Sequence, residues 1–272
     1  MPVLDLDASI VPRRAASAEE AAALVVGDGA AVVDGCPTLE AAVATATAVL
    51  GDRLAKVAPQ FEATSSGYLA NLAKLAGQQP DRRGRVRRFT PPDEVMVAHN
   101  DGYGFGDLAP DHLFLWCETA DPGGGASWLV DAVRLLRQLE ARPDQRDLAR
   151  FCWDVPVDHS EPGFLEHAPS PIARRVEPGR VQVRHQPYLA GVWGSPDRAR
   201  HDAQVEAWHE AVRSARDRAE RFHLEPGQLL CVDNYRVLHG RDPYGFDGRK
   251  VVSIWGWTTE AVAMPEQPVH LV

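Results

Sequence analysis

Residues 229–241 read LLCVDNYRVLHGR, an apolar run that ends in a polar turn and is followed by a histidine. The run predicts a buried strand, and the Asp-Asn pair predicts the turn that ends it. A second apolar strand is predicted at residues 250–258 (KVVSIWGWT), with residues 236–249 as the loop between the two. His239 therefore lies between two β segments, where its side chain can enter a shared site.

A second motif lies upstream in residues 95–102 (VMVAHNDG), where His99 and Asp101 end a short β-like run. Because residues i and i+2 of a strand point to the same face, the imidazole and the carboxylate are expected to project together. The pair alone would equally suit a strand-end surface pair, and His239 alone would suit a structural turn histidine. Together, two imidazoles and one carboxylate on one face of a metal leave the opposite face open, as in non-heme Fe(II) oxygenases.

Arg249 lies ten positions after His239 and opens the strand predicted at residues 250–258. The open positions of such a metal would hold a bidentate 2-oxo acid and dioxygen. An arginine in the same barrel would present a planar, permanently charged fork to the distant carboxylate of 2-oxoglutarate. Alone, Arg249 would equally suit a surface cation. The order of the motifs, with β segments on both sides, favours the functional interpretation.

Short β-like runs separated by turns make up much of the remaining chain. Further strands are predicted at residues 113–119 and 127–131, and helices at residues 17–28, 38–50, 68–77, 133–142 and 196–222. This pattern predicts a mainly β (α+β) fold, an antiparallel sandwich or barrel with helical decoration. Residues 1–272 are expected to form a single domain, with a helical N-terminal segment over about residues 1–57 and a helical insertion over about residues 196–222.

The composition limits the classes of partner. The 272 residues include 38 acidic and 29 basic side chains, a formal net charge of −9. This balance argues against nucleic-acid binding, because phosphate contacts require a concentrated basic surface. No apolar run approaches the roughly 18 residues of a membrane span, and Asp5 and Asp7 stand where a signal peptide needs positive charge. We therefore expect a cytoplasmic protein with a small-molecule partner and no membrane contact; the oligomeric state is left open.

With these motifs in place, the sequence resembles the TauD/TfdA-like, clavaminate-synthase-like family of Fe(II)/2-oxoglutarate dioxygenases. The matching stretches are AHND (98–101), LFLWC (113–117) followed by DPGGGASWLVD (121–131), DNYRVLHGR (233–241) and Arg249. They cover about residues 94–257, with the middle unmatched. The resemblance implies a double-stranded β-helix core of the jelly-roll, cupin-like kind. It also implies Fe(II) as cofactor, consumption of 2-oxoglutarate and O2, release of succinate and CO2, and abstraction of a hydrogen atom from an unactivated C–H bond.

The resemblance also assigns roles to single residues. The residues that match the catalytic iron ligands are His99, Asp101 and His239. Arg249 matches the partner of the C5 carboxylate of 2-oxoglutarate. Ser127 stands where the family usually has a threonine that contacts the same group, and a serine hydroxyl still donates one hydrogen bond. Arg241 is a second candidate for this carboxylate. Related halogenases replace the metal carboxylate by a small residue, so Asp101 argues against halogenation.

Substrate contacts in this architecture are expected from the N-terminal segment, the loop after the H-x-D motif and the middle of the chain. The candidate residues are Tyr68, Tyr103, Phe105, Arg184 and His185. The glycine-rich stretch GYGFGD (102–107) could close over the iron, with its two aromatic rings as walls, although a flexible hairpin is an equal alternative. Strand packing explains the last two candidates nearly as well. The arginine run DRRGRVRR (81–88) is predicted to be a solvated hairpin or loop.

The leading hypothesis is oxidation of a C–H bond in a small amino-acid-derived or other specialised metabolite, as in natural product and antibiotic biosynthesis. Hydroxylation is the first expectation, with desaturation or ring formation as variants. Within the family, the alternative is a catabolic dioxygenase that acts on a sulfonate or aryloxy acid. Two other classes stay open: a zinc-dependent hydrolase that uses the same His/Asp/His site, and a β-sandwich binding protein that retains a metal site.

Overall fold

The computed structural model describes residues 6–63, 79–163, 166–176, 179–245 and 249–266. Its strands are β1 (Arg13–Ala15), β2 (Ala30–Val33), β3 (Leu54–Ala63), β4 (His112–Thr119), β5 (Ser127–Asp131), β6 (Ala173–Val176), β7 (Arg180–Val183), β8 (Leu229–Asp233), β9 (Val237–Arg241) and β10 (Lys250–Thr258). Its helices are α1 (Ala18–Asp28), α2 (Leu39–Leu50), α4 (Ala132–Ala141), α5 (Arg146–Asp154) and α6 (Arg198–Arg218), with short 3-10 helices η1 (Gly51–Arg53) and η2 (Tyr103–Leu108).

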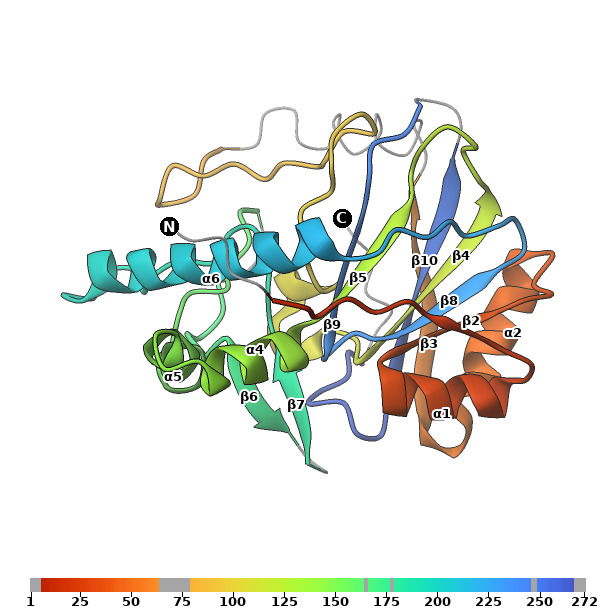
Figure 1. Cartoon of the computed structure of the whole chain (residues 1–272), viewed down its shortest axis with the longest axis horizontal. Coiled ribbons are helices and arrows are strands. Elements are labelled where there is room, and N and C mark those ends of the chain that lie inside the picture. The colour runs from red at the N-terminus through yellow and green to blue at the C-terminus, as the bar shows by residue number, and fades with distance from the viewer. Residues whose placement is uncertain (1–5, 64–78, 164–165, 177–178, 246–248, 267–272) are drawn as a thin grey trace.

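Two sheets face one another and form the core of the molecule (Figure 1). The main sheet has the order β1-β2-β8-β4-β10-β3, while β5 pairs with β9 in a second sheet and β6 with β7 in a third. Apolar side chains from both of the first two sheets meet in one buried cluster, which includes Leu113 and Leu230 of the main sheet and Leu129 and Val237 of the β5–β9 sheet. The arrangement confirms the predicted mainly β fold with helical decoration.

Helices cover the outer faces of both sheets. Helices α1 and α2 lie against the main sheet, where Val49 packs in one cluster with Ile254. Helices α4, α5 and α6 lie on the side of the β5–β9 sheet, where Leu136 packs in another cluster with Trp128. The layers therefore follow the order helix, sheet, sheet, helix. This order leaves the interface between the two sheets as the place for a buried site.

The alternation of side chains along β10 decides which residues reach this interface. Val252 and Ile254 pack toward α1 and α2, whereas Val251 and Trp255 belong to the cluster between the sheets. Successive strand residues point to opposite faces, so Ser253 also faces the interior. This strand thus delivers a hydroxyl group and an indole to the same side of the sheet.

The helices predicted at residues 17–28, 38–50 and 133–142 are confirmed as α1, α2 and α4. Ser17 caps α1 by accepting a hydrogen bond from the amide of Glu20, and Thr38 caps α2 by accepting one from the amide of Ala41. Asp131 caps α4. Helix α6 falls within the predicted helical insertion at 196–222. Among the described residues, no helix is both long enough and apolar enough to cross a membrane.

Two local predictions are wrong. Residues 95–99 do not form a strand; only His99 makes an isolated β-bridge. Residues 236–249 are not all loop, because Val237–Arg241 form β9 and pair with β5. His239 is therefore held within a ladder and not in a turn. The helix predicted over residues 68–77 lies outside the described residues, and the single-domain organisation stays a prediction.

Candidate metal centre

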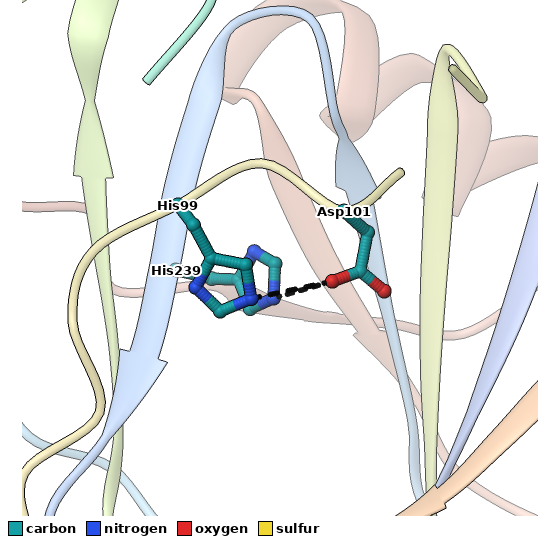
Figure 2. Close-up of side chains that lie close together, drawn as sticks. All are labelled: His99, Asp101 and His239. Carbon is teal, nitrogen blue, oxygen red and sulfur yellow. Dashed lines mark ion pairs between the residues drawn. The ribbon is translucent and has the colours of Figure 1, made fainter. Parts of the chain in front are cut away.

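Three side chains from distant parts of the sequence converge between the two sheets (Figure 2). His99 Nε2 and His239 Nε2 each lie 3.4 Å from Asp101 Oδ1. The centroids of the two imidazole rings are 4.4 Å apart. One ligand atom from each residue lies within 4.8 Å of the others, so the group has the composition and spacing to hold one metal ion. Donors of this kind, two imidazoles and one carboxylate, suit Fe(II) and Zn²⁺.

A backbone bridge brings the two histidines together. The His99 amide donates to the His239 carbonyl at 3.3 Å, and the His239 amide donates to the His99 carbonyl at 3.1 Å. Residues directly opposite one another in an antiparallel pair project on the same face. The bridge thus aligns the two imidazoles although 139 residues separate them in the sequence.

Asn234 holds the backbone of the third candidate ligand. Its side-chain oxygen accepts from the Asp101 amide at 2.9 Å, and its side-chain nitrogen donates to the Asp101 carbonyl at 3.0 Å and to the Pro110 carbonyl at 2.7 Å. Because residues 95–99 form no strand, this asparagine fixes Asp101 where a ladder would otherwise do so. Asn234 thus ties the turn before β9 to the backbone on both sides of the Asp101 side chain.

The remaining polar atoms of the three side chains are arranged so that one atom of each faces the others. His99 Nδ1 lies 2.8 Å from the Val97 carbonyl, which leaves Nε2 directed at Asp101. Asp101 Oδ2 accepts from Ser253 Oγ and from Trp255 Nε1, both at 2.8 Å. His239 Nδ1 is buried without a hydrogen-bond partner among the described residues.

Burial and mutual charge shift the titration of all three groups. Burial acts to raise the pKa of Asp101, but its hydrogen bonds with the two histidines outweigh this and hold that pKa well below its ordinary value. Burial acts to lower the pKa of His99, yet the hydrogen bond and charge of Asp101 raise it overall. For His239, burial and the neighbouring His99 lower the pKa. An ionised carboxylate and a neutral imidazole are the forms that a metal requires.

Arg249 precedes β10 and lies against the Tyr244 ring, with its guanidinium carbon 5.6 Å from the ring centroid. Burial lowers its pKa, and it makes no hydrogen bond or ion pair with any residue that the structure describes. A Cβ on Gly125, which has φ +69°, would lie 2.7 Å from Arg249 Cδ. The absence of a side chain at Gly125 therefore provides the space in which the aliphatic part of Arg249 lies.

Arg241 has a different environment. Its guanidinium donates to several backbone carbonyls of residues 90–94, including that of Pro92 at 2.9 Å and that of Pro91 at 2.8 Å, and burial lowers its pKa to about 10. Ser127 is opposite Arg241 in the β5–β9 ladder. It is buried, and its backbone pairs with Phe222 at 2.7 and 3.0 Å.

A cavity of about 330 Å³ opens beside the three convergent side chains. It is lined by Arg87, Arg88, Phe89, Thr90, Met96, Val97, His99, Asp101, Gly102, Tyr103, Gly104, Phe105, Glu161, Pro187, Tyr188 and Trp255. Tyr103 and Phe105, predicted as walls, belong to this lining. They lie on the 3-10 helix η2, so the glycine-rich stretch is helical in part and not a hairpin.

Two other predicted substrate residues, Arg184 and His185, do not belong to the lining of the cavity. Arg184 donates to Ser170 Oγ at 3.1 Å, and the His185 ring packs edge-on against Trp208, with ring centroids 5.9 Å apart. Both side chains are buried. Tyr68 lies outside the described residues.

The arginine run contributes residues that sequence reasoning missed. Arg83 pairs with Asp158 at 2.6 Å and Arg87 pairs with Glu161 at 2.6 Å, and the side chains of these pairs are only 3–15% exposed. Arg82 and Arg88 are 46% and 67% exposed. The run forms a loop, as predicted, but it is solvated only in part, because Arg83 and Arg87 are buried. Their partners are carboxylates more than 70 positions away, which no local pattern in the sequence indicates.

Comparisons with known proteins place the chain in a family. The family model described as taurine catabolism dioxygenase TauD, TfdA family, matches residues 4–255. The chain belongs to this TauD/TfdA family. Membership confirms the family predicted from the four motifs. The sequence is also similar to an L-lysine 3-hydroxylase from Catenulispora acidiphila, at 29% identity over 161 residues, which are 53% of this chain and 40% of that protein.

Solved structures of oxygenases share the fold. Asparagine oxygenase in complex with Fe(II), 2S,3S-3-hydroxyasparagine and succinate superposes with a TM-score of 0.56 and 18% identity, covering 89% of this chain and 79% of that chain. The non-heme iron oxygenase OrfP in complex with Fe and alpha-ketoglutaric acid gives a TM-score of 0.51 and 16% identity, covering 89% and 79%. The likeness confirms the predicted fold class for this TauD/TfdA family member.

Proposed function

We propose that this TauD/TfdA family member is an Fe(II)- and 2-oxoglutarate-dependent oxygenase that oxidises a C–H bond of a small amino-acid-derived or other specialised metabolite. The observation that carries the proposal is the convergence of His99, Asp101 and His239 beside a cavity of about 330 Å³. The donor set fits the metal, because each residue directs one nitrogen or oxygen at the others while its remaining polar atom is hydrogen-bonded or buried. Neutral imidazoles and an ionised carboxylate suit Fe(II).

Each residue of the site has a separate role under this proposal. His99, Asp101 and His239 would hold the iron, and Arg249, whose guanidinium pairs with no residue that the structure describes, would bind the distant carboxylate of 2-oxoglutarate. Bound iron supplies the coupled reduction of dioxygen and oxidation of 2-oxoglutarate to succinate and CO2, which leads to removal of a substrate hydrogen atom. The Arg241 guanidinium donates its hydrogen bonds to the carbonyls of residues 90–94, which supports a structural role. Arg249 is therefore favoured as the 2-oxoglutarate contact.

The lining of the cavity supports an amino-acid-derived substrate. Aromatic side chains such as Phe89 and Tyr188 make part of its lining apolar. Glu161 and Arg87 bring charges of both signs to its lining, 2.6 Å apart, which suits a molecule that carries an amine and a carboxylate. A sulfonate or aryloxy acid would use Arg87 but would meet the Glu161 carboxylate, so the lining favours the first substrate class over the catabolic alternative.

The test is a measurement of succinate release with a panel of amino acids and their derivatives. The purified protein, supplied with Fe(II), ascorbate, 2-oxoglutarate and oxygen, is expected to release succinate faster when the substrate is present. The Asp101→Ala variant should release none while it remains folded. Turnover that Zn²⁺ supports without 2-oxoglutarate would favour the hydrolase, and parent-like succinate release by Asp101→Ala would refute the assignment of the site.

A further inference from the structure

Two side chains of β10 converge on a single oxygen of Asp101. Ser253 Oγ and Trp255 Nε1 both donate to Oδ2 at 2.8 Å, while Oδ1 faces the Nε2 atoms of the two histidines at 3.4 Å. The two donors stand two positions apart on one strand and so project on the same face of the main sheet. The two carboxylate oxygens therefore have separate surroundings: one faces the strand and the other faces the imidazoles.

An ionised carboxylate has only acceptor lone pairs, about two on each oxygen. Two donors on Oδ2 use the lone pairs that a second metal bond from the same carboxylate would require. They also fix the rotation of the carboxylate plane, because a turn about the Cβ–Cγ bond would break both hydrogen bonds. Only Oδ1 is then left for a metal.

We propose that Ser253 and Trp255 are positioning residues that make Asp101 a one-oxygen ligand and strengthen metal binding. The proposal rests on the metal site of the proposed function and deepens it. A carboxylate that binds through one oxygen occupies one coordination position in place of two, which keeps positions open for 2-oxoglutarate and dioxygen. Groups that orient metal ligands typically contribute 10–100-fold to metal affinity or activity.

Trp255 also connects this carboxylate to the substrate cavity. Its ring lines the cavity and packs edge-on against Phe105 of η2 and Trp257 of β10, with centroids 5.7 and 6.1 Å apart. These contacts fix the orientation of the indole and hence the direction of its N–H group. A substrate in the cavity would therefore lie against the same ring that holds the metal carboxylate.

Trp257 offers a matched control. It lies on the same strand and the same face, it is fully buried, and its indole N–H donates to the Leu108 carbonyl at 2.9 Å and not to Asp101. Replacing either tryptophan by phenylalanine removes one indole hydrogen bond from the interior. Only Trp255→Phe removes one from the carboxylate, so a difference between the two variants reports on positioning and not on the general loss of packing.

The experiment is a titration of the metal-free full-length protein with Co²⁺, followed by its visible absorption, for the parent and for Trp255→Phe, Ser253→Ala, Trp257→Phe and Asp101→Ala. We expect Trp255→Phe and Ser253→Ala to bind Co²⁺ about 10–100-fold more weakly and to alter the intensity of the visible bands. Trp257→Phe keeps an aromatic ring beside Trp255 and removes no donor from Asp101, so it should keep the parent affinity and spectrum. Urea unfolding of each metal-free variant identifies those that are folded.

The outcomes separate this proposal from the proposed function. If Asp101→Ala binds Co²⁺ as tightly as the parent, the metal site itself is refuted. If Asp101→Ala loses binding while Trp255→Phe and Ser253→Ala keep the parent affinity and bands, only the positioning role is overturned. Ser253→Ala keeps the indole contact intact, so it tests the role independently should Trp255→Phe fail to fold.

Discussion

Gly240 lies directly opposite Trp128 in the β5–β9 ladder, and a Cβ added to it would approach Trp128 Cζ2 to 2.1 Å. The indole fills the space beside the residue that follows His239. Trp128 is fully buried in the cluster under α4 and α6, so the ring cannot move away without displacing other core side chains.

We therefore expect Gly240→Ala to lower the free energy of unfolding by about 1–3 kcal/mol through overpacking and to weaken metal binding, because the clash falls next to His239. Urea unfolding and Co²⁺ titration measure the two effects. Gly27→Ala is the control, since Gly27 lies exposed in α1 with no atom within 4 Å of an added Cβ. Parent-like stability and metal affinity in Gly240→Ala would contradict the prediction.

The two candidate arginines should respond differently to removal. Arg249→Ala is expected to raise the 2-oxoglutarate concentration that gives half-maximal succinate release by about 30- to 800-fold, which corresponds to about 2–4 kcal/mol for a lost charge-assisted pair. Arg241→Ala should mainly lower the free energy of unfolding, because it frees the carbonyls of residues 90–94. Steady-state kinetics and urea unfolding of both variants separate the roles, and the reverse pattern would move the carboxylate contact to Arg241.

Glu161 is a buried acidic residue of the cavity lining, and under the proposed function it would bind a substrate amine. Burial raises its pKa, although Arg87 and Tyr103 oppose this shift. Glu161→Gln keeps the shape and removes the charge. We expect the KM for an amine-bearing substrate to rise about 10- to 100-fold, as for a lost hydrogen bond to a charged group, with the 2-oxoglutarate requirement unchanged.

The control for this change is Glu166→Gln. Glu166 is 58% exposed and pairs with Arg82 at 3.0 Å, away from the lining of the cavity. Its loss should leave both kinetic parameters at the parent values. An unchanged substrate KM in Glu161→Gln would show that the carboxylate serves only to hold Arg87.

Asp111 should govern part of the acid stability. Burial acts to raise its pKa, but contacts with His112, Thr258 and Arg180 outweigh this and hold the pKa well below its ordinary value. The carboxylate accepts from Thr258 Oγ1 at 2.6 Å and from Arg180 at 2.9 Å. In the unfolded chain an aspartate takes up its proton near pH 3.9. Below about pH 5 the unfolded state therefore binds more protons than the folded state, and the free energy of unfolding decreases as the pH is lowered.

Asp111→Asn is expected to cost about 1–3 kcal/mol at pH 7, because Thr258 and Arg180 lose their hydrogen bonds to a charged acceptor while Arg180 keeps its ion pair with Asp233 at 2.8 Å, and to flatten the loss of stability between pH 5 and pH 3. Urea unfolding as a function of pH provides the measurement. Asp147→Asn, at a side chain that is 92% exposed, should leave both the stability and its pH dependence unchanged. Equal slopes for the parent and Asp111→Asn would count against the assignment.

Sequence reasoning succeeded where a periodic pattern carried the information. The apolar runs predicted β4, β5, β8 and β10 closely, and the spacing of His99, Asp101 and His239 predicted a convergence that the structure contains. The convergence does not come from a regular strand at residues 95–99, however. A single backbone bridge and the side chain of Asn234 produce it, and neither has a periodic signal in the sequence.

The walls of the cavity were less predictable. Tyr103 and Phe105 could be predicted because they follow the H-x-D motif. Glu161 and Tyr188 come from an irregular region in which chain direction depends on tertiary contacts. Arg83 and Arg87 were misjudged because a charged run usually faces water. Their burial depends on Asp158 and Glu161, partners more than 70 positions away that no local pattern indicates.

The alternation along β10 has a consequence for the tolerance of this strand to length changes. Removal of one residue between Arg249 and Ser253 would move the side chains before the deletion to the opposite face of the sheet relative to those after it. The arginine and the serine–tryptophan pair could then no longer occupy the same side of the sheet. A substitution within this stretch would change one side chain, but deletion of a single codon would separate Arg249, the proposed 2-oxoglutarate contact, from the two side chains proposed to position the Asp101 carboxylate.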